Sequence, residues 1–309
     1  MAVERQAVHA GRCPAAQWNG PLARMGSPRP LTRTLECLNN LEDDQMRIAP
    51  RLMIAIPILN VWLVGVVGAQ SLPTQEEKQA LAPTGKLRAA LYLGGPTNVI
   101  KDPTTGEMKG VGYEIGKELA RRMGVPYEAV TYQTPKLLVD DVNSGNWDVA
   151  FVARDSNREK IMNFTGIYLS LEHGYLVPAG SPIEKISDVD RPGIRLGVPA
   201  GGSVIPPLKR VLRNAEIIEV GMPDAAELVR SGKVDVFAAN KANLFAISDK
   251  LPGSRILDGR FSVDEFALGT PKGREAGMSF VRKFIEDIKS EGLVKAASKR
   301  AGVRGAIEE

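Results

Sequence analysis

Residues 112–133, GYEIGKELARRMGVPYEAVTYQ, predict a helix that is followed directly by a strand. Ile115, Leu119 and Met123 recur at intervals of four residues, which places them on one face of a helix. A glycine then ends the helix, and PYEAVTYQ (126–133) contains the aromatic and β-branched residues that favour strands. This stretch therefore indicates an α/β protein in which an amphipathic helix covers a sheet.

The alternation continues on both sides of this stretch. LRAALYL (87–93) predicts a strand before it, and WDVAFVA (147–153) predicts a buried strand after it, with a helix over 135–145 between them. Alternating strands and helices indicate a mostly parallel sheet with helices on both faces. Residues 102–110 have the turn chemistry of a hairpin loop, and the polar residues 71–85 are expected to be a linker.

A second block of the same kind follows HGYLVPAG (173–180) and predicts a second α/β lobe. Its expected strands and helices are strands at 194–198, 216–220 and 234–239, a helix opened by 201–203, and a helix over 224–231. The chain is expected to return near 264–268 and to end in a helix, roughly 274–290, that packs on the first lobe. Two lobes joined by two crossovers enclose a cleft, where ligands commonly bind.

Length, composition and charge are those of an ordinary globular protein with two domains. The chain has 309 residues, of which 43% are hydrophobic and 25% are charged, and its net charge is +4. Basic residues occur in pairs, such as Arg121-Arg122 and Lys299-Arg300, and form no tract. Because nucleic-acid binders usually carry a clustered basic stripe, we expect no nucleic-acid partner.

An export segment is predicted at residues 47–69. Arg47 and Arg51 precede the apolar residues 52–67, and Val67-Gly68-Ala69 has the small residues that a signal peptidase reads, so cleavage is expected after Ala69. A membrane anchor is the alternative, since the apolar run is about long enough to span a bilayer. Residues 1–46 are expected to be a non-native or disordered extension, with Met46 as the initiator.

Both cysteines, Cys13 and Cys37, precede this segment, and His173 is the one histidine that follows it. A mature chain without cysteine excludes disulfides, a cysteine nucleophile and thiolate metal ligands. A single histidine is a poor basis for a zinc site or a histidine-dependent triad. We therefore expect no metal site, no cofactor and no catalytic residue.

The order of segments over about 85–303 resembles the family 3 periplasmic solute-binding proteins, the polar amino-acid receptors of ABC transporters. The segments that carry the resemblance are GVGYEIGKELARRMGV (110–125), LVDDVNSGNWDVAF (138–151), SNREKIMNFTGIY (156–168), SPIEKISDVDRPGIRLGVPAGGS (181–203), DEFALGTPKG (264–273) and FIEDIKSEGLVKAASKRAG (284–302).

The resemblance implies a two-lobed periplasmic-binding-protein fold and a role in import. Residues 86–177 plus 266–309 would form lobe one, and residues 181–263 would form lobe two. The protein would be a periplasmic monomer that binds a small carboxylate-bearing solute, an amino acid or related organic acid, in the interlobe cleft and delivers it to an ABC transporter permease.

The resemblance also implies a carboxylate site. In the family an arginine after the third strand clamps the ligand carboxylate, and Arg158 matches it here. A guanidinium fork suits this role because it binds a carboxylate bidentately. The preceding loop is two residues shorter than in the family, which leaves Arg154 as an alternative register. Gly202 and Ser203 would add backbone and hydroxyl donors at the start of a helix.

The expected amine site departs from the family. Where family members have an aspartate that binds the ligand's α-ammonium group, this chain has Asn240. A buried ammonium group without an anion is costly, so either the ligand is not a standard α-amino acid or the anion is another residue, Asp155 or Glu172. Tyr92 is the first candidate for an aromatic wall because it ends the first strand, ahead of Tyr113 and Tyr132.

Two other functions remain open at this point. Some proteins of this fold are prephenate or arogenate dehydratases, which need a general acid beside a bound carboxylate. Other relatives are accessory proteins of periplasmic quinoprotein dehydrogenases, which keep the fold without the small-ligand chemistry.

Overall fold

The computed structural model describes residues 72–102 and 104–307, which lie in one compact unit. The predicted extension over 1–46 and the predicted export segment over 47–69 fall outside the described residues. Within the described part of the chain, no helix is both long enough and apolar enough to cross a membrane.

The first lobe is built on three parallel strands in the order β4-β1-β5: β1 (Leu87–Tyr92), β4 (Tyr127–Tyr132) and β5 (Val149–Ala153). Its helices are α1 (Gln75–Leu81), α2 (Val111–Met123), α3 (Pro135–Asp140), α7 (Met278–Ser290) and α8 (Leu293–Ala301). The predicted strands 87–93, 126–133 and 147–153 and the predicted amphipathic helix are confirmed, with shifts of one or two residues at their ends.

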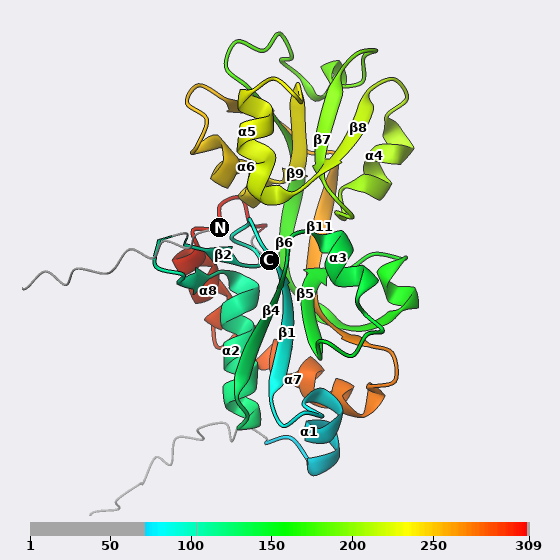
Figure 1. Cartoon of the computed structure of the whole chain (residues 1–309), viewed down its shortest axis with the longest axis vertical. Helices are drawn as coiled ribbons and strands as arrows, with labels where there is room; N and C mark the ends of the chain where they lie inside the picture. The colour runs from blue at the N-terminus through cyan, green and yellow to red at the C-terminus, as the bar shows by residue number, and fades with distance from the viewer. Residues whose placement is uncertain (1–71, 103, 308–309) are drawn as a thin grey trace, which may run out of the picture. The chain divides into compact units, whose positions relative to one another are not determined.

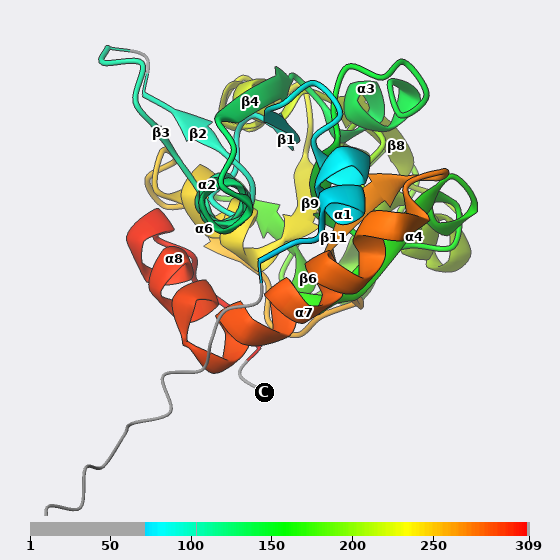
Figure 2. The same ribbon diagram turned by 90° about the horizontal axis from the view of Figure 1, so that it is seen from below.

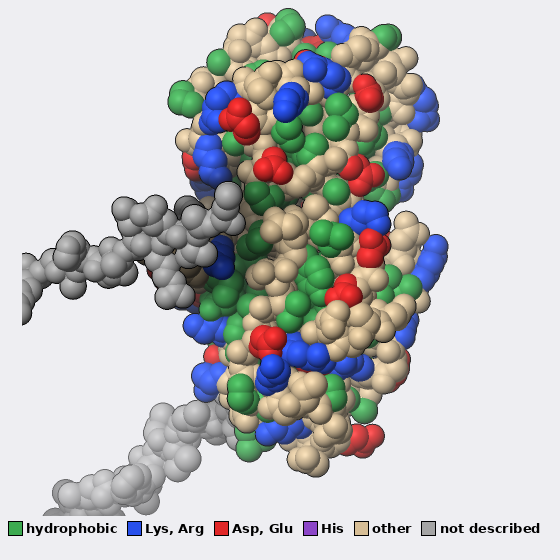
Figure 3. Space-filling model, viewed as in Figure 1, with side chains coloured by type: hydrophobic (Ala, Val, Ile, Leu, Met, Phe, Trp, Pro, Cys, Tyr) green, Lys and Arg blue, Asp and Glu red, His purple; other side chains and the backbone are tan. Residues whose placement is uncertain are grey.

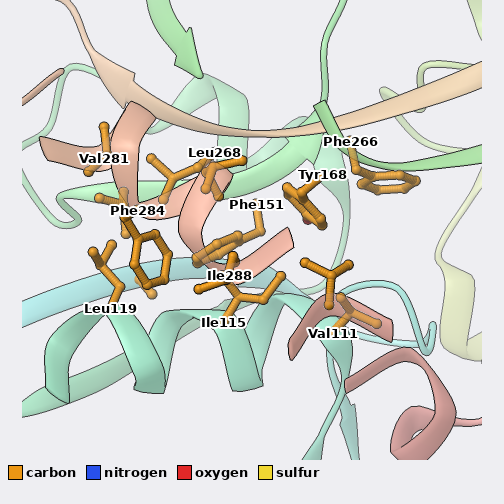
Figure 4. Close-up of a cluster of buried hydrophobic side chains, with 14 of the residues drawn as sticks. Val111, Ile115, Leu119, Phe151, Tyr168, Phe266, Leu268, Val281, Phe284 and Ile288 are labelled. Carbon is orange, nitrogen blue, oxygen red and sulfur yellow. The ribbon is translucent and has the colours of Figure 1, made fainter. Parts of the chain in front are cut away.

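The core of the first lobe lies between its sheet and helices α2 and α7. Ile115 and Leu119 of α2 point toward Phe284 of α7 and Phe151 of β5 (Figure 4). Ile115, Leu119 and Met123 are all buried, as their spacing predicts. Full burial of one such side chain stabilises a fold by about 1.5–3 kcal/mol, so this shared face fixes the position of α2.

The second lobe repeats the arrangement with three parallel strands in the order β8-β7-β9: β7 (Arg195–Pro199), β8 (Glu216–Val220) and β9 (Val236–Asn240). Its helices are α4 (Ile205–Val211), α5 (Ala225–Arg230) and α6 (Lys241–Ser248). Its cores are separate from that of the first lobe, with Val198 and Leu208 in one cluster and Phe237 in another. The restart of the pattern after 173–180 is therefore confirmed.

Two long antiparallel strands, β6 (Met162–Val177) and β11 (Ser262–Pro271), run between the lobes (Figure 1). They join the strands into one sheet of order β4-β1-β5-β11-β6-β9-β7-β8, with β10 (Arg255–Ile256) paired to β6. The mostly parallel sheets expected in the two lobes are thereby continuous with one another. The 16 residues of β6 span roughly 50 Å at about 3.3 Å per residue, so one strand supplies side chains to both lobes.

A small hairpin of β2 (Ile100–Lys101) and β3 (Met108–Lys109) projects from the first lobe (Figure 2). Its pairing confirms the hairpin predicted around residues 102–110. On the described part of the face seen in Figure 3, Lys and Arg side chains are interspersed with acidic and uncharged ones.

Three predicted elements differ from the structure. The expected linker over 71–85 contains α1, which a capping box between Thr74 and Glu77 begins. The buried Leu81 then packs against Gly277. The expected helix over 135–145 ends at Asp140, and the terminal helix begins at Met278, after a 3-10 turn.

The two lobes share one ion-pair arrangement at the start of their central strands. In the first lobe, Asp148 accepts from the backbone N, Nε and Nη2 of Arg88 at 2.9, 3.0 and 2.7 Å. In the second lobe, Asp235 accepts from the same three atoms of Arg195 at 2.8, 3.0 and 2.7 Å. Each aspartate follows a Ser-Gly turn, in SGNWD (144–148) and SGKVD (231–235), so the repeat is visible in the sequence.

Candidate functional site

A small cavity, called here the interlobe cavity, lies at the carboxyl ends of parallel strands from both lobes. Its lining residues are Tyr92, Pro135, Ala153, Arg158, His173, Pro199, Gly202, Ser203, Val204, Met222, Ala239, Asn240, Asn243 and Asp264. Tyr92, Ala153, Pro199 and Asn240 are the last residues of β1, β5, β7 and β9. Open α/β sheets bind ligands at this edge. The cavity volume is about 20 Å³, which is close to the space that one water molecule needs.

Arg158 begins the 3-10 turn η1 (Arg158–Lys160) after β5, and its side chain is buried. Its Nη1 donates to the carbonyl oxygen of Ala153 at 2.5 Å, and its Nη2 donates to the carbonyl oxygen of Gly201 at 2.9 Å. The second bond joins the two lobes. Arg158 therefore lines the interlobe cavity, and its guanidinium group contacts the second lobe at Gly201.

Asp155 holds this turn in place. Its Oδ1 accepts the backbone N–H groups of Asn157 and Arg158 at 2.8 and 3.0 Å, and its Oδ2 lies 3.3 Å from Nε of Arg158. Asp155 is outside the lining of the cavity. Arg154 is also outside it, and its partly exposed side chain pairs with Glu159 at 2.7 Å.

The segment from Ala200 to Ser203 forms the second-lobe wall. Lys136 N donates to the carbonyl oxygen of Ala200 at 3.1 Å, which is a second bond between the lobes. Gly201 has φ +66°, and a Cβ atom there would lie 2.6 Å from Cα of Lys136. Gly202 and Ser203 line the cavity, but α4 begins at Ile205, so Ser203 is not its N-cap.

A buried carboxylate, Asp264 of β11, lies in the cavity beside Ser203 and Asn240. Ser203 Oγ donates to its Oδ1 at 2.5 Å, and Asn240 Nδ2 donates to its Oδ2 at 3.1 Å. Asn240 also caps α6 by accepting the N–H of Asn243 at 3.1 Å. Both polar ends of the Asn240 side chain are therefore bound to protein groups.

His173 of β6 also contacts the carboxylate of Asp264. Its Nε2 is 3.1 Å from Oδ1 of Asp264, although the contact lacks hydrogen-bond geometry, and neither ring nitrogen has a hydrogen-bond partner among the described residues. Phe261 stacks on the ring with centroids 5.5 Å apart. Burial by itself would raise the pKa of Asp264, but the adjacent His173 and the bonds from Ser203 and Asn240 lower that pKa below its ordinary value.

Sequence reasoning missed Asp264. DEFALGTPKG (264–273) indicated the return of the chain, and nothing in it distinguished Asp264 from a surface acid. The pairing of β6 with β11 on one side and with β9 on the other brings Asp264, His173 and Asn240 together.

The remaining predicted residues divide between the cavity and other places. Tyr92 lines the cavity, and burial raises the pKa of its phenol well above the ordinary value. Tyr113 packs against Tyr127 with ring centroids 5.6 Å apart, and Tyr132 binds Asp141. Neither lines the cavity.

Glu172 also lies outside the lining of the cavity. Its carboxylate pairs with Lys241 at 2.6 Å and with Arg260 at 3.1 Å. Among the described residues, no group of three or more His, Cys, Asp or Glu side chains could hold a metal ion.

Comparison with known proteins defines the class. The model of the bacterial extracellular solute-binding proteins, family 3, matches residues 94–302, so the chain belongs to this family. The resemblance seen in the sequence is thereby confirmed. The glutamine-binding protein of Geobacillus stearothermophilus is 23% identical over 214 residues, which cover 66% of this chain and 81% of that protein.

Solved structures show the same fold. An amino acid ABC transporter substrate-binding protein from Streptococcus pneumoniae, bound to L-arginine, has a TM-score of 0.66 at 21% identity, covering 72% of this chain and 97% of that one. An ancestral amino acid-binding protein, a precursor of cyclohexadienyl dehydratase, has a TM-score of 0.64 at 20% identity, covering 72% and 98%. These likenesses confirm the two-lobed α/β fold.

Proposed function

We propose that this protein is the substrate-binding component of an ABC importer and that it holds a small carboxylate-bearing solute in the interlobe cavity. The buried guanidinium of Arg158, between the end of β5 and the Gly202-Ser203 wall, is the observation that supports this most. Its described contacts engage three of its five N–H donors, by hydrogen bonds to Ala153 and Gly201 and the approach to Asp155. Two donors remain for a carboxylate.

Binding requires the lobes to move apart. A cavity of about 20 Å³ is too small for an amino acid, so a solute must enter when the two lobes have separated. We propose that residues 86–177 plus 266–309 and residues 181–263 move as rigid bodies, with one hinge near 175–180, where β6 ends, and one near 264–268 in β11. Opening would break the bonds from Arg158 to Gly201 and from Lys136 to Ala200, and closure on the solute would restore the contact between the lobes.

A binding screen tests the proposal. L-Glutamine and L-arginine are the first probes, because one relative is a glutamine-binding protein and one similar structure holds L-arginine. Succinate and lactate represent acids without an amine. A bound solute stabilises the fold by about 2.7 kcal/mol at a hundredfold excess over its Kd, which a thermal-shift assay detects. Absence of a shift with amino acids and organic acids alike would contradict the proposal.

The dehydratase alternative calls for a direct assay. Such an enzyme needs a general acid beside the bound carboxylate, and the His173–Asp264 pair is the feature of the cavity that could fit. Incubation of the purified protein with prephenate, followed by measurement of phenylpyruvate, separates the two functions. We expect no turnover.

We further propose that the protein is exported through the segment 47–69, is cleaved after Ala69, and works as a periplasmic monomer with a membrane permease. The apolar run before Val67-Gly68-Ala69 supports this. N-terminal sequencing of periplasmic protein should return Gln70 as the first residue. A sequence that begins upstream of Arg51 would contradict cleavage.

A further inference from the structure

The interlobe cavity is lined by side chains of opposite charge. Among the described residues that line it, Arg158 is the arginine, Asp264 is the carboxylate, and His173 is the group whose charge ordinarily changes between pH 5 and 8. A cavity with one fixed cation and one buried anion suits a solute that carries a carboxylate and a cationic group. Uncompensated charge in such a cavity is costly, which disfavours a solute with a carboxylate alone.

The carboxylate of Asp264 has capacity for another donor. Ser203 and Asn240, which donate to it, are neutral, so neither cancels its charge. A carboxylate offers about four acceptor sites, and these two hydrogen bonds occupy two of them. The negative charge therefore remains available to a cation that enters the cavity.

We propose that Asp264 receives the cationic group of the solute, in place of residue 240, and that protonated His173 competes with that group for the same carboxylate. This inference rests on the proposed function, because it assumes that the solute occupies the interlobe cavity. The solute then binds only when His173 is neutral. If His173 is protonated beforehand, binding of the cationic group is coupled to loss of that proton from His173.

The surroundings of His173 make Asp264 its partner for a proton. The ring is buried, Phe261 covers one face, and its nitrogens have no other acceptor among the described residues. Three other ionisable groups line the cavity with His173: Asp264 of β11, Arg158 of η1 and Tyr92 of β1. Glu172, the residue before His173 in β6, forms ion pairs with Lys241 of α6 and with Arg260, which precedes β11.

Matched pairs of probes test the proposal. Calorimetry on the full exported protein would compare each L-amino acid with the α-hydroxy acid that lacks the amine, such as alanine with lactate, aspartate with malate and phenylalanine with phenyllactate. We expect the wild type to prefer the amino acid of at least one pair. D264N should lose at least about thirtyfold in affinity for that amino acid and much less for the hydroxy acid.

A pH series provides a test that needs no Asp264 variant. Wild-type affinity for the amino acid should fall as the pH is lowered from 8 to 5, by up to about tenfold per pH unit, because one proton competes with one ammonium group. H173Q should bind the amino acid with little pH dependence over this range. This series decides the matter if D264N does not fold.

The outcomes separate the two proposals. If D264N binds amino acids as tightly as the wild type does, or loses both classes equally, Asp264 does not receive the cation. If the wild type binds hydroxy acids as tightly as amino acids while R158A binds neither, the carboxylate site stands and the role of Asp264 is overturned. If no amino acid or organic acid binds, the proposed function fails and this inference fails with it.

Discussion

The side-chain amide of Asn240 donates a hydrogen bond to the buried carboxylate of Asp264, with 3.1 Å between Nδ2 and Oδ2. The two residues lie on β9 and β11, on either side of β6. An aspartate at position 240 would place two carboxylates in contact, and two such groups cannot both remain ionised at low cost. The neutral amide of Asn240 therefore suits a position beside the ionised Asp264, and the pair places a single negative charge in the cavity.

Asn240→Asp should destabilise the protein more at pH 8 than at pH 5. The two adjacent carboxylates would share a proton, which raises the pKa of one of them in the folded state above its unfolded value. Such a group makes its full contribution to stability below the pKa that it has in the unfolded state. This contribution is lost as the pH rises through its higher pKa in the folded state. Chemical denaturation at the two pH values measures the effect.

Asn157→Asp is the control for that experiment. Asn157 is exposed and its Oδ1 accepts from Lys160 at 3.1 Å, so an added negative charge has a cation beside it. We expect little pH dependence from this variant. Equal pH profiles for the two variants would show that Asp264 and residue 240 do not interact.

Arg158→Ala should abolish solute binding and leave the fold intact. Removing one partner of a buried, hydrogen-bonded charge pair costs about 2–5 kcal/mol, which corresponds to roughly thirtyfold to several-thousandfold in affinity. Arg154→Ala is the control, since Arg154 is half exposed and lies outside the lining of the cavity. Normal binding by the Arg158 variant together with loss of binding by the Arg154 variant would reverse the assignment.

Gly201→Ala should weaken solute binding by holding the lobes apart. The new Cβ atom would lie 2.6 Å from Cα of Lys136, which belongs to the other lobe. The relief of that overlap requires the closed state to open, and a shift of about 1.4 kcal/mol against closure lowers the affinity about tenfold. Small-angle scattering should show a larger radius of gyration in the presence of solute.

Gly232→Ala separates this wedge from backbone strain. Gly232 has the same φ of +66° but no atom within 4 Å of the new Cβ position. Both alanines therefore carry a left-handed strain of about 1–2 kcal/mol, and only the one at 201 meets the opposite lobe. A loss of affinity that is equal in the two variants would argue against the wedge.

Asp148→Asn should destabilise the fold more than Asp235→Asn does, although both residues hold an arginine in the same geometry. The Asp148 side chain is fully buried and also pairs with Arg274 at 2.9 Å, whereas the Asp235 side chain is 31% exposed. We expect a loss of about 3–5 kcal/mol at Asp148 and about 1 kcal/mol at Asp235. Urea denaturation measures both, and equal losses would show that burial does not set the difference.

The sequence by itself determined the parts that depend on neighbouring residues. The spacing of Ile115, Leu119 and Met123 fixed α2, and the apolar runs fixed β1 and β5, because periodicity reports which face of an element is buried. The order of family segments placed Arg158 after β5. Helix α1 was not predicted, and its segment was expected to be a linker. A short helix such as α1 is stabilised by contacts with residues that are remote in the chain, here through Leu81.

Only the tertiary structure decided the charge arrangement of the cavity. Asn240 matched the family position for an anion, and its lack of charge pointed to Asp155 or Glu172 as the replacement. Asp155 instead holds the Arg158 turn, and Glu172 pairs with Lys241. The carboxylate in the cavity belongs to Asp264, 24 residues beyond Asn240. The pairing of β6 with both β9 and β11 creates that proximity, and strand pairing between distant segments leaves no local pattern in a sequence.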